Sequence, residues 1–324
     1  MSRHLKLRHS FRVDVRAPYS FFRTFGKNTG FGIDWFWMSP FDVRDRGAYW
    51  ASTFISPGKT VGLKITASDS LNPKTIGVAA FCSSALSAEE MSEVRRLISQ
   101  CLSASEDIAP FYELARGFPS LKNASRHLRG MRVLHTPDLF ASLLLAVCLQ
   151  RASFGRSKKM LESIFNHYGS RLSFGGRTTV STPSPSAIIN AGADKIKKTC
   201  RVGYRADSIV SAADFILRTG IRTVENFFEM PQEQVEATLK TIRGIGPYSV
   251  SVISPHPAFP VDSWSGPALA KLLGVEAPDG NVIQALQAFA TEKFGVWQRY
   301  AYEYLVNDLD HLVKIPGAAG VTRG

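Results

Sequence analysis

The sequence predicts an α+β protein, in which an N-terminal antiparallel β-sheet with one helix precedes a larger all-α domain. Two patterns carry this prediction. β-Branched and aromatic residues separated by turn signals dominate the first part of the chain, whereas windows of helical periodicity dominate the rest. The 324 residues also exceed the roughly 100–200 of a typical single domain. We therefore expect domains over 1–105 and 106–315 and a flexible tail over 316–324.

Five segments of the N-terminal part have strand character. They are 11–15 (FRVDV), 33–38 (IDWFWM), 49–55 (YWASTFI), 60–66 (TVGLKIT) and 75–83 (TIGVAAFCS). The last two predict a β-hairpin. The segment that follows changes to a helical period, since Met91, Val94 and Ile98 succeed one another at three- or four-residue steps. It predicts an amphipathic helix packed on the sheet.

Beyond Ile108 the sequence is a series of helical windows divided by Gly, Pro or Ser. They are 107–117, 136–153, 157–169, 185–200, 205–220, 231–244, 247–254, 265–274, 281–295 and 296–310. Between two of them, 170–186 has the Gly, Ser, Thr and Pro content of a surface loop. We therefore expect the larger domain to be helical.

The charge balance favours a polyanionic partner. Lys and Arg number 39 against 27 Asp and Glu, which gives a formal charge of +12 and an isoelectric point near 9.7. The basic residues recur along the chain, as expected for a broad contact with a phosphate backbone, although a well-solvated surface gives the same pattern. Nucleic acid is thus favoured over an acidic membrane.

The cysteine and hydropathy patterns exclude other classes of protein. Cys82, Cys101, Cys148 and Cys200 stand too far apart for a zinc or iron–sulfur cluster, so we expect buried thiols and no such cofactor. No apolar run approaches the roughly 20 residues of a membrane span, and the N-terminus lacks a signal-peptide pattern. We expect an intracellular protein with no membrane partner, cytoplasmic or at the nucleoid in a prokaryote and nuclear in a eukaryote.

The strongest local signal lies in the segment 239–253. A helix ends there at Arg243, Gly244-Ile245-Gly246 makes a tight turn, and Pro247 begins a second helix. Free amides at the start of that helix favour a phosphate and read no base, which suits a sequence-independent grip on DNA. An ordinary joint between two helices has a similar sequence, so the motif alone leaves both interpretations open.

A candidate catalytic carboxylate follows this turn. Sixteen residues after Gly246, an apolar segment delivers Asp262 to the start of another helix. The positive end of a helix favours the charged form of a carboxylate. By the same position Asp262 is a candidate N-cap, which is a common use of aspartate. The two roles are compatible.

Gly244-Ile245-Gly246 followed by Phe259-Pro260-Val261-Asp262 resembles the signature of the helix-hairpin-helix DNA glycosylase superfamily, in which Asp262 matches the catalytic aspartate. The segments 136–153 and 200–216 look like further parts of that fold, and the likeness spans roughly residues 106–308. The 3-methyladenine DNA glycosylase II branch is the nearest, with some likeness to 8-oxoguanine DNA glycosylase. The four closely spaced cysteines of the iron–sulfur branches are absent.

The resemblance implies base flipping and hydrolysis of an N-glycosidic bond in base excision repair. Bifunctional 8-oxoguanine enzymes place a Schiff-base lysine where this chain has Tyr248, so we expect a monofunctional enzyme. Alkylated purines of the 3-methyladenine or 7-methylguanine type are already cationic and depart without a second acid, which suits a single carboxylate. The alternatives are an 8-oxoguanine or uracil glycosylase of the same superfamily, or a non-catalytic DNA-binding protein.

The resemblance also implies residues around the base. Tyr248 and Trp297 are the candidate stacking residues of the base pocket, although Trp297 equally has the pattern of a core aromatic. Gln150 and Arg151 match the wedge loop that fills the gap left by a flipped base, and Arg151 is equally a candidate phosphate contact. Arg205 is expected at the DNA surface as well.

The family holds a monovalent cation, Na⁺ or K⁺, in its hairpin, which implies the backbone carbonyls of Lys240, Ile242 and Ile245 as its ligands here. No other cofactor is expected. The expected partner is double-stranded DNA with a damaged base, bound by a monomer.

Overall fold

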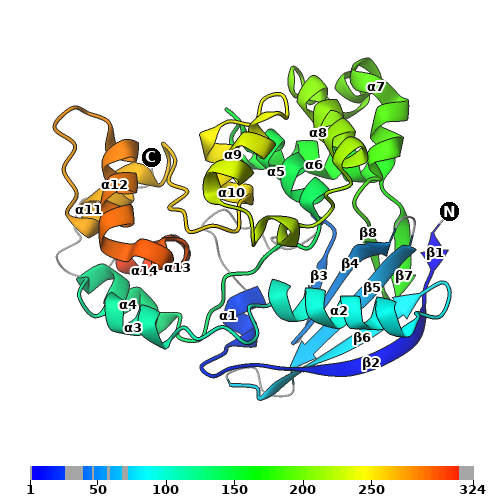
Figure 1. The fold of residues 1–324 in the computed structure, drawn as a ribbon, viewed down its shortest axis with the longest axis horizontal. Helices are drawn as coiled ribbons and strands as arrows, with labels where there is room; N and C mark the ends of the chain where they lie inside the picture. Colours follow the sequence, from blue (N-terminus) through cyan, green and yellow to red (C-terminus); the bar gives the residue numbers. More distant parts are fainter. Residues whose placement is uncertain (1, 26–38, 46, 57–58, 68–71, 314–324) are drawn as a thin grey trace.

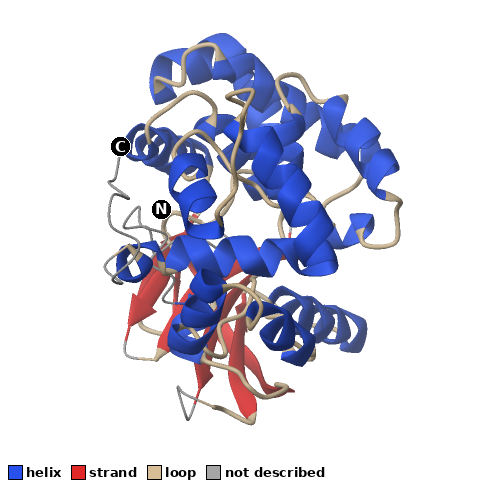
Figure 2. Cartoon of the chain, turned by 90° about the vertical axis from the view of Figure 1, so that its left-hand side faces the viewer, coloured by secondary structure: helices blue, strands red, loops and turns tan. Residues whose placement is uncertain are grey.

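The computed structural model describes residues 2–25, 39–45, 47–56, 59–67 and 72–313 (Figure 1). The candidate strand over 33–38 and the tail over 316–324 lie outside these residues. The architecture is α+β, as predicted, with the strands gathered in one part of the molecule and helices around them and beyond (Figures 1 and 2). In the described part of the chain, no helix combines the length and the apolar character needed to cross a membrane.

The N-terminal strands form a five-stranded antiparallel sheet in the order β2-β6-β5-β4-β3. Its strands are β2 (Lys6–Asp14), β3 (Val43–Asp45), β4 (Ala48–Ser56), β5 (Lys59–Ala67) and β6 (Thr75–Cys82). The predicted hairpin of the last two strands is confirmed, because Leu63 pairs with Ala80 and Ile65 with Val78. All four side chains are buried in one hydrophobic cluster, since residues two apart on a strand share a face.

Helix α2 (Ala88–Cys101) packs against the sheet, as predicted (Figure 1). It begins with a capping box. The Glu90 amide donates to Ser87 Oγ at 3.1 Å, and the Ser87 amide donates to the Glu90 carboxylate at 2.8 Å. Val94 and Ile98 are fully buried in the cluster that also holds the sheet residues. The apolar stripe of this helix therefore faces the sheet.

The surface loop predicted over 170–186 is wrong, because part of that segment is a β-hairpin. Strands β7 (Arg171–Phe174) and β8 (Arg177–Val180) pair with each other, and β7 pairs in parallel with β1 (Arg3–His4). Leu172 and Phe174 are buried with Trp50 and Phe81 of the five-stranded sheet. The two glycines of the turn have φ of +54° and +80°, which a tight hairpin turn requires. Because surface loops are also rich in glycine, the sequence alone did not distinguish the hairpin from a loop.

The rest of the chain is helical and forms two buried clusters, one from α5 to α10 and one from α3, α4 and α11 to α14. The remaining helices of the described residues are α1 (Phe21–Phe25), α3 (Ala109–Ala115), α4 (Pro119–His127), α5 (Leu139–Leu149), α6 (Phe154–Tyr168), α7 (Pro185–Cys200), α8 (Arg205–Thr219), α9 (Gln232–Lys240), α10 (Pro247–Ile253), α11 (Gly266–Leu273), α12 (Val282–Phe294), α13 (Gln298–Asn307) and α14 (Leu309–Leu312), with short 3₁₀ turns η1 (Val224–Phe227) and η2 (Gly295–Trp297). Each predicted window overlaps one α-helix, except that 296–310 covers α13 and reaches the start of α14, and α1 and α4 lie outside the predicted windows. Cys82, Cys101, Cys148 and Cys200 are free and buried, as predicted.

The segment 254–265 connects the two helical clusters. It leaves α10 at Ser254 and enters α11 at Gly266. Phe259 and Val261 are buried in the second cluster. Because these side chains fix the segment, it presents Asp262, which is half-buried, where the two clusters join.

Candidate active site

The turn between α9 and α10 uses its two glycines differently. Gly244 has a φ of +81°, and a Cβ on it would lie 2.5 Å from Ser208 Oγ on α8. Gly246 is the extended residue before α10, and a Cβ on it would meet no atom within 4 Å. Gly244 therefore satisfies a packing constraint of the fold. Gly246 instead leaves open space in front of the backbone at the start of α10.

The predicted wedge residue Gln150 is tied to this turn. Its Nε2 donates to the Gly244 carbonyl at 2.6 Å and to Ser249 Oγ at 3.5 Å. The next residue, Arg151, is exposed and has a φ of +44° in the turn that follows α5. The loop at Gln150 and Arg151 and the turn at Gly244 thus form one unit, from which the Arg151 side chain reaches solvent.

The expectation that Arg205 contacts DNA at the surface is wrong. Its exposed fraction is 3%, and its guanidinium donates to the backbone carbonyls of Val202 and Gln150. A buried arginine that satisfies carbonyls orders the chain around it instead of meeting a phosphate. Arg205 therefore supports the loop at Gln150 from within the fold.

Asp262 caps the turn that leads into α11. Its Oδ1 accepts hydrogen bonds from the amides of Trp264 at 3.1 Å and Ser265 at 2.8 Å, and from Ser265 Oγ at 2.8 Å. In return, the Asp262 amide donates to Ser265 Oγ at 3.2 Å. These bonds fix the carboxylate through one oxygen. They account for its hydrogen bonding with the described residues and leave Oδ2 for another group.

Two tyrosines lie near this carboxylate. Burial, followed by the negative charge of Asp262, raises the pKa of Tyr248 on α10 to about 12. Burial and then the Asp262 charge also raise the pKa of Tyr302 on α13 well above its ordinary value. The ring of Tyr302 packs edge-on against Phe259, at 5.4 Å between centroids. A fixed carboxylate with two neutral phenols beside it therefore stands where α10, α13 and the 254–265 segment meet.

Comparison with known proteins agrees with this geometry, although no protein-family model matches the chain. The DNA-3-methyladenine glycosylase of Bacillus subtilis is 25% identical over 175 residues, which are 52% of this chain and 57% of that enzyme. The solved 3-methyladenine DNA glycosylase of Archaeoglobus fulgidus superimposes with a TM-score of 0.72 at 18% identity, over 93% of this chain and 99% of its own. The fold is that of this solved DNA glycosylase. The resemblance to DNA glycosylases read from the sequence is thereby confirmed.

A second structure places the same fold in another branch. The 8-oxoguanine glycosylase/lyase of Clostridium acetobutylicum, solved with duplex DNA that contains cytosine opposite 8-oxoguanine, has a TM-score of 0.69 at 20% identity. That match covers 95% of this chain and 97% of the other. The fold that these two enzymes share therefore does not by itself determine which damaged base is removed.

Within this glycosylase fold, Trp297 sits among core aromatics. Its ring centroid lies 5.6 Å from that of Tyr300 and 6.1 Å from that of Phe111, a fully buried residue. The side chain is half-buried in the second helical cluster. These contacts support the interpretation of Trp297 as a core aromatic, and its role in a base pocket stays a prediction.

Sequence reasoning missed two residues of the site. Tyr302 follows Tyr300 and precedes Tyr304, which are both buried in the core, so it lies on the other face of α13. An aromatic residue on that face was the available signal. Arg299 donates to the carbonyls of Ser251 at 3.2 Å and Val252 at 2.9 Å at the end of α10. It fastens α13 to the helix that carries Tyr248, and such long-range contacts leave no local pattern.

The cation expected in the hairpin of this glycosylase fold stays a prediction. Lys240 is the last residue of α9, and the Ile242 carbonyl already accepts a hydrogen bond from the Ile245 amide at 3.1 Å. A carbonyl oxygen has a second lone pair, and the last carbonyls of a helix lack helical partners. The turn is therefore chemically suited to a monovalent cation.

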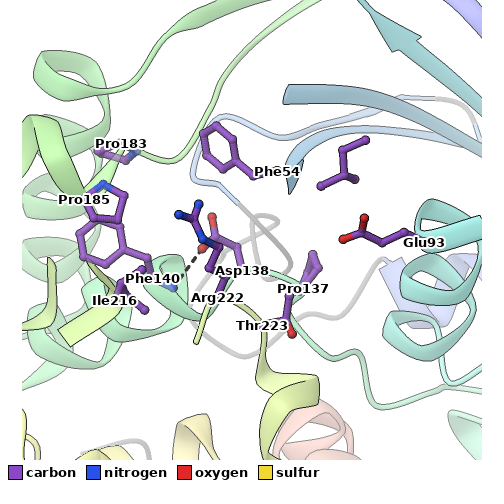
Figure 3. Close-up of a pocket in the computed structure, with 11 residues that line it drawn as sticks. Phe54, Glu93, Pro137, Asp138, Phe140, Pro183, Pro185, Ile216, Arg222 and Thr223 are labelled. Atoms are coloured by element: carbon purple, nitrogen blue, oxygen red, sulfur yellow. Dashed lines mark hydrogen bonds between the residues drawn. The ribbon is translucent and has the colours of Figure 1, made fainter. Parts of the chain in front are cut away.

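One cavity of the described structure belongs elsewhere. It has a volume of about 100 Å³ and lies between β4 and α2 on one side and the helical part on the other (Figure 3). Asp138 on its wall accepts a hydrogen bond from the Phe140 amide at 2.9 Å and so caps α5. Neither Asp262 nor its two tyrosines line this cavity. It is a packing gap between layers, separate from the candidate active site.

Proposed function

We propose that the chain is a DNA glycosylase that rotates a damaged base out of duplex DNA and hydrolyses its N-glycosidic bond. The observation that carries this proposal is the Asp262 carboxylate, fixed through one oxygen beside Tyr248 and Tyr302. The similarity to a Bacillus glycosylase and to two solved glycosylases supports it. Chemistry on a base requires that the base leave the stack, and the loop at Gln150 and Arg151 would fill the gap that it leaves.

The reaction needs a negative charge at the sugar. When the bond between C1′ and the base nitrogen breaks, the electron pair leaves with the base and positive charge builds on the sugar. The Asp262 carboxylate would stabilise that charge through its free oxygen. A water oxygen then bonds to C1′, and its proton passes to the carboxylate or to solvent. Because three hydrogen bonds hold Oδ1, the carboxylate needs little reorganisation during this step.

The substrate that we propose is an alkylated purine. A purine alkylated at N3 or N7 carries a positive charge, so it departs without protonation by a second acid. Such a base is electron-poor and stacks favourably on aromatic rings, which Tyr248 and Tyr302 would supply. The Bacillus relative is a 3-methyladenine glycosylase, which supports this choice.

We also propose that the enzyme does not cut the strand. Strand cleavage by a Schiff base requires an amine at the sugar, and Tyr248 stands at the position where the bifunctional branch carries its lysine. Because burial raises the pKa of Tyr248 to about 12, its phenol stays neutral at physiological pH. Tyr248 would therefore shape the base pocket and stack on the base, and would not act as a nucleophile.

A second candidate is 8-oxoguanine removal, which the likeness to the Clostridium glycosylase/lyase favours. One experiment separates the substrates. Duplexes that contain 7-methylguanine, 3-methyladenine, 8-oxoguanine or uracil are incubated with the protein, and free base and strand nicks are measured separately. We expect release of the methylated bases without nicking. Release of 8-oxoguanine alone would refute the alkylpurine substrate and favour 8-oxoguanine removal. Nicking without added base treatment would contradict the hydrolytic mechanism.

The Asp262→Asn variant tests the carboxylate. Asparagine can accept the same amide hydrogen bonds at an N-cap, so the variant should fold and bind DNA. We expect its rate of base release to fall at least 100-fold, since the charge at the sugar is lost. Asp279→Asn is the matched control, because Asp279 also accepts a backbone amide, at 3.1 Å from Asn281, in an exposed turn. Activity that survives in Asp262→Asn would refute the mechanism, and no base release from any duplex would indicate a DNA-binding protein.

A further inference from the structure

Three side chains with metal-binding atoms converge away from Asp262. His127 ends α4, Asp308 lies between α13 and α14, and His311 is on α14. One ligand atom from each lies within 4.8 Å of the other two. His127 Nδ1 hydrogen-bonds to Asp308 Oδ1, and His311 Nδ1 lies 3.2 Å from Asp308 Oδ2. Both imidazoles thus point at one carboxylate from opposite oxygens, although their residues are 181 and 3 positions away.

The carboxylate of this cluster is buried, whereas its two imidazoles are about half exposed to solvent. The Asp308 side chain is 1% exposed, whereas those of His127 and His311 are 53% and 48% exposed. A buried carboxylate requires compensation by hydrogen bonds or by positive charge. The two imidazole rings lie 4.4 Å apart at 40°, so they form one side of a small site that is open to solvent.

We propose that His127, Asp308 and His311 bind a divalent transition metal ion of the Zn²⁺ class. Two imidazole nitrogens and one carboxylate oxygen are ligands that such ions take, and hard cations such as Mg²⁺ prefer oxygen alone. An imidazole nitrogen binds such an ion through its lone pair, so binding competes with a proton and depends on pH. The buried carboxylate supplies the negative charge, and water completes the coordination on the exposed side.

The distances are compatible with such a site after small rotations. Zinc–ligand distances of roughly 2.1 Å in a tetrahedral arrangement place ligand atoms about 3.4 Å apart. The ligand atoms here lie within 4.8 Å of one another, so a bound ion requires them to approach more closely. The half-exposed imidazoles can rotate toward the carboxylate to do so. The bound ion would join the end of α4 to α14. Its role would be structural, because its ligands come from the end of α4 and from α14 and the residue before it.

The test uses the full chain, free of any affinity tag and stripped of metal with a chelator, and titrated with Zn²⁺ by calorimetry at pH 7.5. We expect one Zn²⁺ per chain, and at least tenfold weaker binding in His127→Ala and in His311→Ala. His167→Ala is the matched control, since His167 is exposed and, among the residues that the structure describes, hydrogen-bonds to Ser163 of its own helix. It should bind Zn²⁺ as the unchanged protein does.

Thermal unfolding keeps the inference testable if a variant is less stable. Zn²⁺ should raise the midpoint of the unchanged protein and of His167→Ala, and it should not raise that of His127→Ala/His311→Ala, whatever the starting stability. The proposal is overturned if the unchanged chain shows no saturable site for one Zn²⁺. It is also overturned if the double variant binds Zn²⁺ with unchanged affinity, in which case the three groups serve as a hydrogen-bonded cluster only.

Discussion

Alanine substitution should separate the two glycines of the hairpin. In Gly244→Ala the new residue must keep a φ of +81°, and its Cβ must approach Ser208 Oγ to 2.5 Å. Left-handed backbone costs an L-residue about 1–2 kcal/mol, and overpacking of a buried contact typically adds about 1–3 kcal/mol. We therefore expect the free energy of unfolding to fall by roughly 2–5 kcal/mol. Adding Ser208→Ala should recover only the packing part, because the backbone conformation is unchanged.

Gly246→Ala should behave in the opposite way. Its φ of −107° is open to any residue, and its Cβ would meet no atom within 4 Å. Alanine is a poorer N-cap than glycine, so we expect the free energy of unfolding to fall by about 1 kcal/mol. If the open space admits a DNA phosphate, the added methyl group should weaken DNA binding about tenfold, which corresponds to about 1.4 kcal/mol.

Urea unfolding and fluorescence anisotropy with a labelled duplex measure the two effects. Gly117→Ala is the control for adding a methyl group, since its Cβ would be in ordinary contact, 3.5 Å from the Leu114 carbonyl. Unchanged stability in Gly244→Ala would refute the close-approach argument. A folded Gly246→Ala with unchanged DNA affinity would show that the start of α10 does not meet the phosphate backbone.

Three further results are expected. Gly62→Ala should lower the free energy of unfolding by about 1–3 kcal/mol, because its Cβ would lie 2.7 Å from the Phe174 ring. The double variant with Phe174→Leu should lose less stability than the two single variants together. Additive losses in urea unfolding would contradict this contact between the sheet and the hairpin. Since burial raises the pKa of Tyr248 from 10 to about 12, the neutral phenol stabilises the fold below pH 10 and that contribution is lost as pH rises through 12. Tyr248→Phe should lose less stability across this range, and parallel pH curves for the two proteins would count against it. Burial raises the pKa of the Cys82 thiol to about 11 and that of Cys148 to about 12, so a thiol reagent at pH 8 should label them only after denaturation, and rapid labelling of the native protein would be the opposite result.

A salt titration adds a check on the proposed partner. The formal charge is +12, and basic residues such as Arg151 reach solvent beside the hairpin. Neutralisation of phosphates releases counterions, so affinity for any duplex should fall steeply as salt rises. A flat response would exclude the phosphate backbone as the main contact.

The sequence by itself determined the features that depend on neighbouring residues. Hydrophobic periodicity located four strands of the five-stranded sheet, β2, β4, β5 and β6, and most helices, because side-chain period follows directly from backbone geometry. The turn at Gly244 and Gly246 and the candidate carboxylate Asp262 lie within one short segment, so their spacing could be recognised. The N-cap and the catalytic interpretations of Asp262 were both available from that segment. The hydrogen bonds of Oδ1 show that Asp262 caps the turn before α11, whose own N-cap residue is Ser265.

Only the tertiary structure decided what distant segments do to one another. Arg205 has the composition of a surface cation, and its burial follows from carbonyls supplied by the chain around Gln150. Tyr302 lies near enough to the carboxylate to feel its charge, on the helix α13 that Arg299 fastens to α10. The strand pairing of β7 with β1 joins residues more than 160 positions apart. Such contacts depend on how whole elements pack, and no local spacing encodes them.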